Sequence, residues 1–148
     1  MTDNRGQEEW FIIVNPNAGN GKGKKDWERI SQLFHRENIS IVPQFTQRKG
    51  QATEYAKEAI DNGFRHIISV GGDGTLNEVI NGIFTQNRIP PEEIMVGMIP
   101  VGTGNDWGRM FGIPTVYEGA VSVIVEKKSM LHDIGVVDYY LGNERHTR

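Results

Sequence analysis

Four short apolar runs, each followed by a polar or glycine-rich loop, constrain the fold of this chain most strongly. The runs are WFIIV (10–14), ISIVPQF (39–45), HIISV (66–70) and IMVGMIP (94–100). Continuous apolar runs of this length are typical of strands that are covered on both faces, as in parallel sheets. Helical patterns lie between the runs, and strands that alternate with helices form parallel sheets through right-handed crossovers. The sequence therefore predicts an α/β domain with a parallel sheet between two helical layers.

Apolar residues at helical spacing predict the helices themselves. The three clearest stripes cover residues 27–34, 52–60 and 76–83. A short helix is expected over 105–111. A further helix is expected after Thr115, which stands three residues before Glu118 and so has the spacing of a capping box. A last strand is expected within residues 129–141.

Composition excludes several classes of protein. The chain has 148 residues, no cysteine and a net charge of −3 from 16 basic and 19 acidic residues. One domain of this length can bury a core without disulfides, and the negative charge does not indicate a nucleic-acid binder. No apolar run approaches the ~20 residues of a membrane span, and residues 1–9 read as a polar tail rather than a signal peptide. We therefore expect a cytoplasmic protein.

Glycine-rich loops follow three of the predicted strands, at residues 15–23, 71–74 and 100–104. Ligands of parallel α/β sheets bind at the carboxyl ends of the strands, where these loops would meet. Glycine lets a ligand approach the main chain closely, and backbone N–H groups at a helix N-terminus bind anions. The three loops together predict a phosphate-binding site.

Each loop also has a structural interpretation. Thr75 and Glu78 fit a capping box that needs no ligand. Asp73 could hydrogen-bond nearby backbone as a turn residue, or it could serve a magnesium-linked water network. For one loop alone the two interpretations are equally open. Three such loops at strand ends favour phosphate binding.

The stretch PVGTGNDWGRMFG (100–112) contains residues that could contact a nucleotide and residues that could cap a helix. Thr103 and Asn105 have short side chains that could reach a nucleotide. Asn105 or Asp106 could equally cap the following helix. Trp107 and Met110 are expected in the core.

The chain has neither a P-loop pattern nor a G-x-G-x-x-G pattern, and its four histidines lack metal-ligand spacing.

The stretches NPNAGNGKG, SVGGDGTLNEVINGI and PVGTGNDWGRMFGIP, in this order, resemble the catalytic domain of diacylglycerol kinases. Sphingosine kinases and bacterial lipid kinases share this domain, and the resemblance runs from about Phe11 to Asp138. GGDGT alone also occurs in NAD kinases and, more loosely, in phosphofructokinases. The pair GGDGTLNEV and GTGND is more specific to lipid kinases. The resemblance implies an enzyme that uses ATP and Mg²⁺ to phosphorylate a lipid hydroxyl.

The resemblance also implies which residues contact the nucleotide. The first loop matches the family's N-P-x-[SA]-G, and TQRKGQA matches its T…GHA segment, with Gln51 where histidine is common. Asp73 is the candidate catalytic residue, which would organise the metal or the acceptor hydroxyl; no metal ligand is assigned. The residues expected to bind ATP are Asn15, Pro16, Asn17, Ala18, Gly19, Thr46, Gly71, Gly72, Asp73, Gly74, Thr75, Leu76, Asn77, Thr103 and Asn105.

Family members continue into a second, β-rich domain that supplies much of the lipid cleft, the proposed general base and a structural metal site. The resemblance therefore assigns residues 10–138 to the nucleotide-binding kinase domain and 139–148 to a tail or to the start of the second domain. The expected partner is a diacylglycerol-like lipid alcohol, reached by transient peripheral membrane contact. A surface left exposed without the second domain could favour a homodimer. The alternatives are an NAD kinase-like enzyme, against which GTGND argues, and a non-catalytic nucleotide-binding module.

Overall fold

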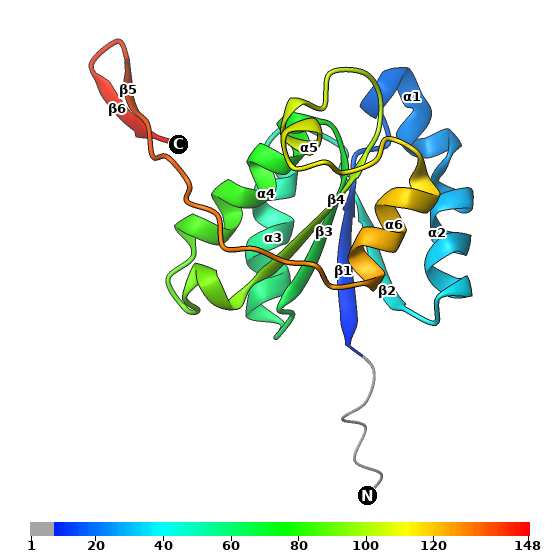
Figure 1. Ribbon diagram of the computed structural model, residues 1–148. Coiled ribbons are helices and arrows are strands. Elements are labelled where there is room, and N and C mark those ends of the chain that lie inside the picture. The colour runs from blue at the N-terminus through cyan, green and yellow to red at the C-terminus, as the bar shows by residue number, and fades with distance from the viewer. Residues whose placement is uncertain (1–7) are drawn as a thin grey trace, which may run out of the picture.

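A parallel sheet of four strands forms the centre of the computed structural model, which describes residues 8–148 (Figure 1). The strands are β1 (Glu9–Val14), β2 (Ser40–Phe45), β3 (His66–Gly71) and β4 (Met95–Pro100), in the order β2-β1-β3-β4. All three neighbouring pairs are parallel. The predicted α/β class and all four predicted strands are confirmed. Residues 1–7 of the predicted tail lie outside the described residues, and Glu9 belongs to β1 rather than to a tail.

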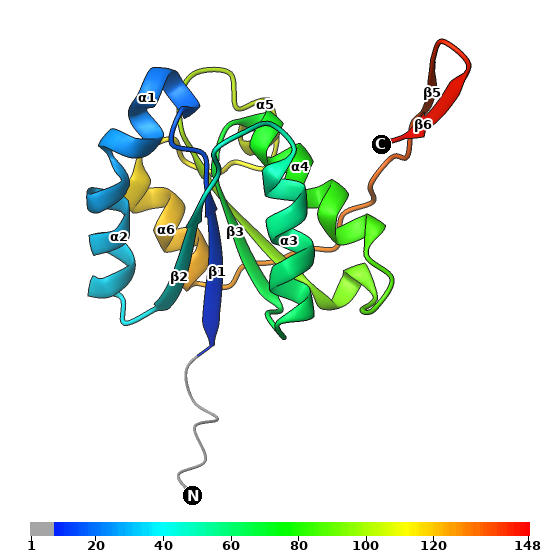
Figure 2. The same cartoon turned by 180° about the vertical axis from the view of Figure 1, so that it is seen from behind.

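Helices cover both faces of the sheet (Figures 1 and 2). One face is covered by α2 (Trp27–Arg36) and α6 (Tyr117–Val125), and the other by α3 (Gln51–Asp61) and α4 (Asp73–Thr85). Two more helices, α1 (Ala18–Lys25) and α5 (Asp106–Met110), and the 3₁₀ helix η1 (Pro91–Glu93) complete the domain. No helix in the part of the chain that the structure describes is long and apolar enough to cross a membrane.

The residues of β1 show why its sequence is apolar without interruption. Successive strand residues point to opposite faces of a sheet. Ile12 and Val14 pack in the cluster with α2 and α6, whereas Phe11 and Ile13 pack in the cluster with α3 and α4. Ile12 and Ile13 are fully buried. Both faces of the strand are therefore core, as the apolar run predicts.

Close packing of α3 on α4 fixes the position of the second glycine-rich loop. A Cβ atom at Gly82 would lie 2.7 Å from the Ala56 Cβ and 2.6 Å from the Thr53 carbonyl oxygen. Only glycine allows the two helices to approach this closely. The N-terminus of α4 is thereby held beside the N-terminus of α3, at the carboxyl end of the sheet.

Two predictions of local structure on the face of α2 and α6 are wrong. Residues 15–23 are not all loop, because Ala18 begins α1, which is interrupted by left-handed backbone from Gly19 to Gly21. Thr115 does not cap α6, since the helix begins at Tyr117 and makes no side-chain cap hydrogen bond. Glu118 forms an ion pair with Arg29 of α2 instead, at 2.7 Å. A tertiary contact has replaced the local capping interaction.

The predicted last strand and the predicted burial of Met110 are also wrong in part. Within residues 129–141 only β5 (Asp138–Leu141) is a strand, and it pairs with β6 (Glu144–Thr147) as a separate hairpin (Figure 1). Val137 still exchanges two backbone hydrogen bonds with Arg148, at 2.8 Å each, but residues 129–136 belong to no strand of the described structure. An apolar pattern cannot distinguish a strand from such an unpaired segment. Met110 is 67% exposed, and Trp107, which is half-buried, packs on Phe111 at 4.6 Å between ring centroids.

Candidate functional site

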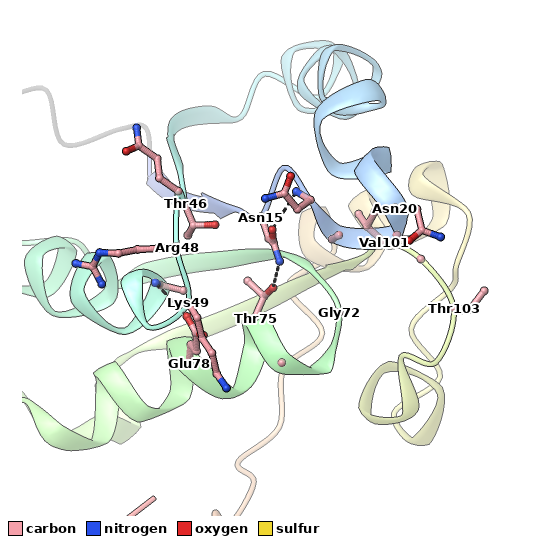
Figure 3. A pocket seen from close by; sticks show the side chains of 17 residues that line it. Asn15, Asn20, Thr46, Arg48, Lys49, Gly72, Thr75, Glu78, Val101 and Thr103 are labelled. Carbon is pink, nitrogen blue, oxygen red and sulfur yellow. Dashed lines mark hydrogen bonds between the residues drawn. The ribbon is translucent and has the colours of Figure 1, made fainter.

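A cavity of about 610 Å³ lies at the carboxyl ends of the sheet strands, where the glycine-rich loops converge (Figure 3). Sites for small molecules commonly measure about 300–1,000 Å³. The residues that line the cavity are Asn15, Asn17, Ala18, Gly19, Asn20, Thr46, Gln47, Arg48, Lys49, Ala52, Gly72, Gly74, Thr75, Glu78, Val101, Gly102 and Thr103. The predicted meeting of the three loops at one site is confirmed.

Asn15 connects the end of β1 to the start of α4. Its backbone N–H donates to the Val70 carbonyl oxygen at 2.9 Å, and its side-chain Nδ2 donates to Thr75 Oγ1 at 3.2 Å (Figure 3). Its Oδ1 accepts the backbone N–H of Asn17 at 3.0 Å, which closes a turn. The asparagine thus shapes the first loop and at the same time fixes the hydroxyl of Thr75.

A contact between two glycines joins the first loop to the loop after β4. Gly19 has φ +60° and Gly102 has φ +95°, and both values lie in the left-handed region. A Cβ atom at Gly19 would lie 2.8 Å from the Gly102 Cα atom. The two main chains therefore touch, and a side chain at either position would push the loops apart.

The central loop places the N-terminus of a helix at the cavity. Gly71 ends β3, Gly72 is the extended N-cap residue, and α4 begins at Asp73. The first N–H groups of a helix have no intrahelical partner, and the helix dipole is positive there. A Cβ atom at Gly71 would lie 2.5 Å from Thr75 Oγ1, so this position requires glycine. The arrangement suits a phosphate group.

The structural interpretation of Thr75 and Glu78 as a capping box does not hold. Thr75 is the third residue of α4, and Gly72 holds the N-cap position. Glu78 reaches across to α3 instead, where its carboxylate accepts the backbone N–H groups of Gly50 at 2.9 Å and Ala52 at 3.3 Å. Thr-x-x-Glu spacing cannot distinguish a local box from such a cross-helix contact.

Asp73 binds backbone N–H groups of a distant segment. Its Oδ2 accepts the N–H of Asp106 at 2.8 Å, and its Oδ1 accepts the N–H of Trp107 at 3.2 Å. The carboxylate therefore caps α5, and Asp73 is not among the residues that line the cavity. Of the two interpretations of Asp73, the structure shows the hydrogen bond to backbone, although to a different loop from its own.

Asn105 holds the N-cap position of α5, but its side chain makes no cap hydrogen bond, and Asp106 is already the first residue of the helix. Asn105, which has φ +43°, donates from Nδ2 to the Gly102 carbonyl oxygen at 3.0 Å. It is only 3% exposed, and its Oδ1 has no hydrogen-bond partner among the described residues. Asp106 is ion-paired with Arg109 on the surface. Asn105 thus holds the shape of the GTGND loop, and it is not among the residues that line the cavity.

The segment TQRKG (residues 46–50), called the 46–50 segment below, forms the side of the cavity next to α3. The Thr46 N–H donates to the Val14 carbonyl oxygen at 2.9 Å, and its hydroxyl donates to the same oxygen at 3.4 Å. Arg48 is ion-paired with Glu54 at 2.7 Å. Lys49 lines the cavity and has no ion-pair partner among the described residues, so it is the side chain best able to meet an anionic ligand.

Nine of the residues predicted to bind ATP line the cavity: Asn15, Asn17, Ala18, Gly19, Thr46, Gly72, Gly74, Thr75 and Thr103. Six do not: Pro16, Gly71, Asp73, Leu76, Asn77 and Asn105. Leu76 is buried, and Asn77 is exposed and accepts from Asn81 at 3.2 Å.

Eight residues of the lining are not among those predicted to bind ATP, namely Asn20, Gln47, Arg48, Lys49, Ala52, Glu78, Val101 and Gly102. Asn20, Val101 and Gly102 nevertheless lie within the predicted glycine-rich loops. The signal that could have found the 46–50 segment is its place directly after a strand, because the carboxyl ends of parallel strands meet at one edge. No signal in the sequence links Glu78 to Gly50.

Comparisons with known proteins agree with this geometry. The model of the diacylglycerol kinase catalytic domain matches residues 9–137. A diacylglycerol kinase of Staphylococcus haemolyticus is 39% identical over 84% of this chain and 36% of its own length. One of Staphylococcus carnosus is 38% identical over 84% of this chain and 39% of its own length.

A crystal structure of a diacylglycerol kinase from Bacillus anthracis superposes with a TM-score of 0.68 at 30% identity. The match covers 81% of this chain and 42% of that one. The chain thus spans well under half the length of the curated relatives that it matches. The family match covers all four strands of the sheet and every residue that lines the cavity. The chain belongs to the diacylglycerol kinase catalytic domain family.

Proposed function

We propose that this chain is the ATP-binding part of a lipid kinase that transfers the γ-phosphate of ATP to the hydroxyl of a diacylglycerol-like lipid. One observation supports this most strongly: the cavity brings together the N-terminus of α4, two glycine-rich loops and Lys49, a cation without an ion-pair partner within residues 8–148. The curated relatives, which this chain matches over 36% and 39% of their length, are named diacylglycerol kinases. The lipid would be reached by transient contact with the cytoplasmic surface of a membrane.

The groups that line the cavity are of the kinds that bind the phosphates and the polar atoms of ATP. Gly72, Gly74 and Thr75 would offer backbone N–H groups to the phosphates, which the positive end of α4 also attracts. Lys49 would neutralise part of the phosphate charge. The remaining polar lining, including Thr46 and Thr103, can hydrogen-bond the rest of the nucleotide.

We expect magnesium to enter the site as an ion carried by the nucleotide. Within residues 8–148 no group of three histidine or acidic side chains could hold a metal. The carboxylates of Asp73 and Glu78 both already accept two backbone N–H groups. Where a protein offers few ligands, Mg²⁺ keeps several of its waters and binds mainly the phosphate oxygens of the nucleotide. When bound, it would neutralise phosphate charge, with Asp73 in contact at most through water.

Phosphoryl transfer requires chiefly that the reacting groups be positioned and their charge balanced. This chain's residues would hold the triphosphate at the helix N-terminus and fix the nucleotide between the loops. The carboxylate that lines the cavity, Glu78, already accepts two backbone N–H groups at the start of α3, so both of its oxygens are occupied. We therefore assign the general base to the part of the longer kinase that this chain does not span.

Calorimetric titration with Mg·ATP tests the proposal, with NAD as competitor. We expect ATP to bind, NAD not to displace it, and Lys49→Met to weaken binding by about tenfold, as loss of one charge-assisted contact would. Lys57→Met on α3 is the matched control, because Lys57 lies outside the cavity lining. Displacement of ATP by NAD would favour the NAD kinase-like alternative. Binding without transfer in the longer protein would favour a non-catalytic nucleotide-binding module.

A further inference from the structure

Glu78 is the acidic side chain in a cavity wall that otherwise suits phosphate. A carboxylate beside a bound triphosphate would repel it, so its presence needs a physical reason. We propose that Glu78 is a positioning residue: it holds the 46–50 segment against α4 and thereby sets the affinity of the cavity for nucleotide. This inference rests on the proposed function, which it deepens.

Glu78 makes three contacts with the start of α3. Its Oε1 accepts the Gly50 N–H at 2.9 Å, and its Oε2 accepts the Ala52 N–H at 3.3 Å. Its own carbonyl oxygen accepts the Thr53 hydroxyl at 2.8 Å. Both oxygens of the carboxylate are thus used on unpaired N–H groups at a helix N-terminus, where negative charge is stabilised. Figure 3 shows Glu78 on α4 beneath the 46–50 segment.

The other contacts of the 46–50 segment leave its position relative to α4 unfixed. Thr46 is bonded to the end of β1, at the beginning of the segment. Gln47 N–H donates to Gln51 Oε1 at 2.6 Å, and Arg48 pairs with Glu54, so both tie the segment to α3 itself. Among the described residues, Glu78 provides the hydrogen bond that joins the segment to the helix carrying the phosphate loop.

Gly50 makes this contact possible. It has φ +85°, and it is the N-cap residue of α3 without a side chain to make the cap. The carboxylate that satisfies its N–H comes from another helix. The carboxylate of Glu78 is consequently bound to the positive N-terminus of α3, which offsets its charge beside an anionic ligand.

The experiment combines two readouts on Glu78→Ala and Glu78→Gln. Backbone hydrogen exchange at Gly50 and Ala52, measured without ligand, reports whether the hydrogen bonds from these N–H groups to residue 78 are formed. Calorimetry with Mg·ATP reports affinity. We expect Glu78→Ala to speed both exchange rates and to weaken ATP binding by about tenfold, the size of one lost charge-assisted contact. Glu78→Gln, with a single acceptor oxygen, should be intermediate in both.

Two controls separate positioning from general destabilisation. Ile83→Val removes a buried methyl group from α4 on the core side, so it should lower the unfolding temperature but leave Gly50 exchange and ATP affinity unchanged. Glu58→Ala removes an exposed acid from α3 and should change neither readout.

Unchanged exchange at Gly50 in Glu78→Ala would overturn the positioning role. Faster exchange with unchanged ATP affinity would overturn the link to nucleotide binding. If the unmodified chain binds no ATP, the proposed function fails and the affinity claim fails with it. Exchange at Gly50 and Ala52 then decides alone whether Glu78 holds the segment.

Discussion

The Asp73 carboxylate accepts the backbone N–H of Asp106 at 2.8 Å, across a separation of 33 residues. A second bond to the Trp107 N–H completes the cap of α5. The GGDGT and GTGND motifs are therefore joined physically, because the acid of the first caps the helix that begins within the second. Gly102 and Thr103, which line the cavity, lie in the loop directly before α5, so the cap also restrains this loop.

Asp73→Ala should destabilise the fold by about 1 kcal/mol, the usual effect of losing a helix N-cap. Urea denaturation measures the change. Asp133→Ala is the control, because Asp133 is exposed and lies outside every helix. Equal unfolding free energies for the two variants would show that the cap contributes nothing.

The dependence of ATP affinity on magnesium tests whether Asp73 also acts on the metal ion. If the carboxylate also contacts water on the nucleotide-bound ion, Asp73→Ala should weaken ATP binding more in Mg²⁺ than in EDTA. If its role is to cap α5 alone, the two affinities should fall by the same factor. Calorimetry in both buffers distinguishes these outcomes.

Gly19→Ala should destabilise the fold by about 1–3 kcal/mol, because the new Cβ would overlap the main chain of Gly102. Gly21→Ala is the matched control: Gly21 also has positive φ, +91°, but a Cβ there meets no atom within 4 Å. The difference between the two variants in urea isolates the contact between the loops from backbone strain. A Gly19→Ala variant as stable as Gly21→Ala would contradict the contact.

Tyr117 should make stability fall at alkaline pH. Burial, and secondly a hydrogen bond from its hydroxyl to Asp26 at 2.7 Å, raise the pKa of Tyr117 to about 12. In the unfolded chain the pKa is about 10, so folding favours the neutral form. This stabilisation is complete below about pH 10 and is lost as pH rises toward 12.

Urea midpoints of the unmodified chain and of Tyr117→Phe, measured from pH 9 to 12, test this expectation. The phenylalanine variant should lose less stability across that range. Tyr55→Phe is the control, since its hydroxyl makes only a 3.5 Å contact with the Phe45 carbonyl oxygen. Parallel curves for the unmodified chain and Tyr117→Phe would contradict the raised pKa.

The sequence predicts the sheet well because strands such as β1 are buried on both faces. Burial on both faces requires consecutive apolar residues, a pattern that distinguishes these strands from elements with an exposed face. It also predicts the meeting of the loops, since parallel strands end at one edge. The partners of Asp73 and Glu78 could not be predicted. Both acids stand where local capping rules apply, but tertiary packing brings a distant helix N-terminus within reach of each.

Burial at the end of the domain could not be predicted either. Met110 follows an apolar pattern yet is 67% exposed, and residues 129–136 belong to no strand of the described structure. Apolar residues indicate burial only if another element covers them.

Amide chemical-shift mapping with Mg·ATP tests the central claim most directly, because it reports on the backbone N–H groups that would hold the phosphates. We predict that the largest shifts fall at Gly72, Gly74 and Thr75, with smaller ones in the 46–50 segment and at Gly102. NAD at the same concentration should leave these amides unmoved. ATP binding that shifts other amides and spares the start of α4, or shifts of the same amides by NAD, would contradict the account.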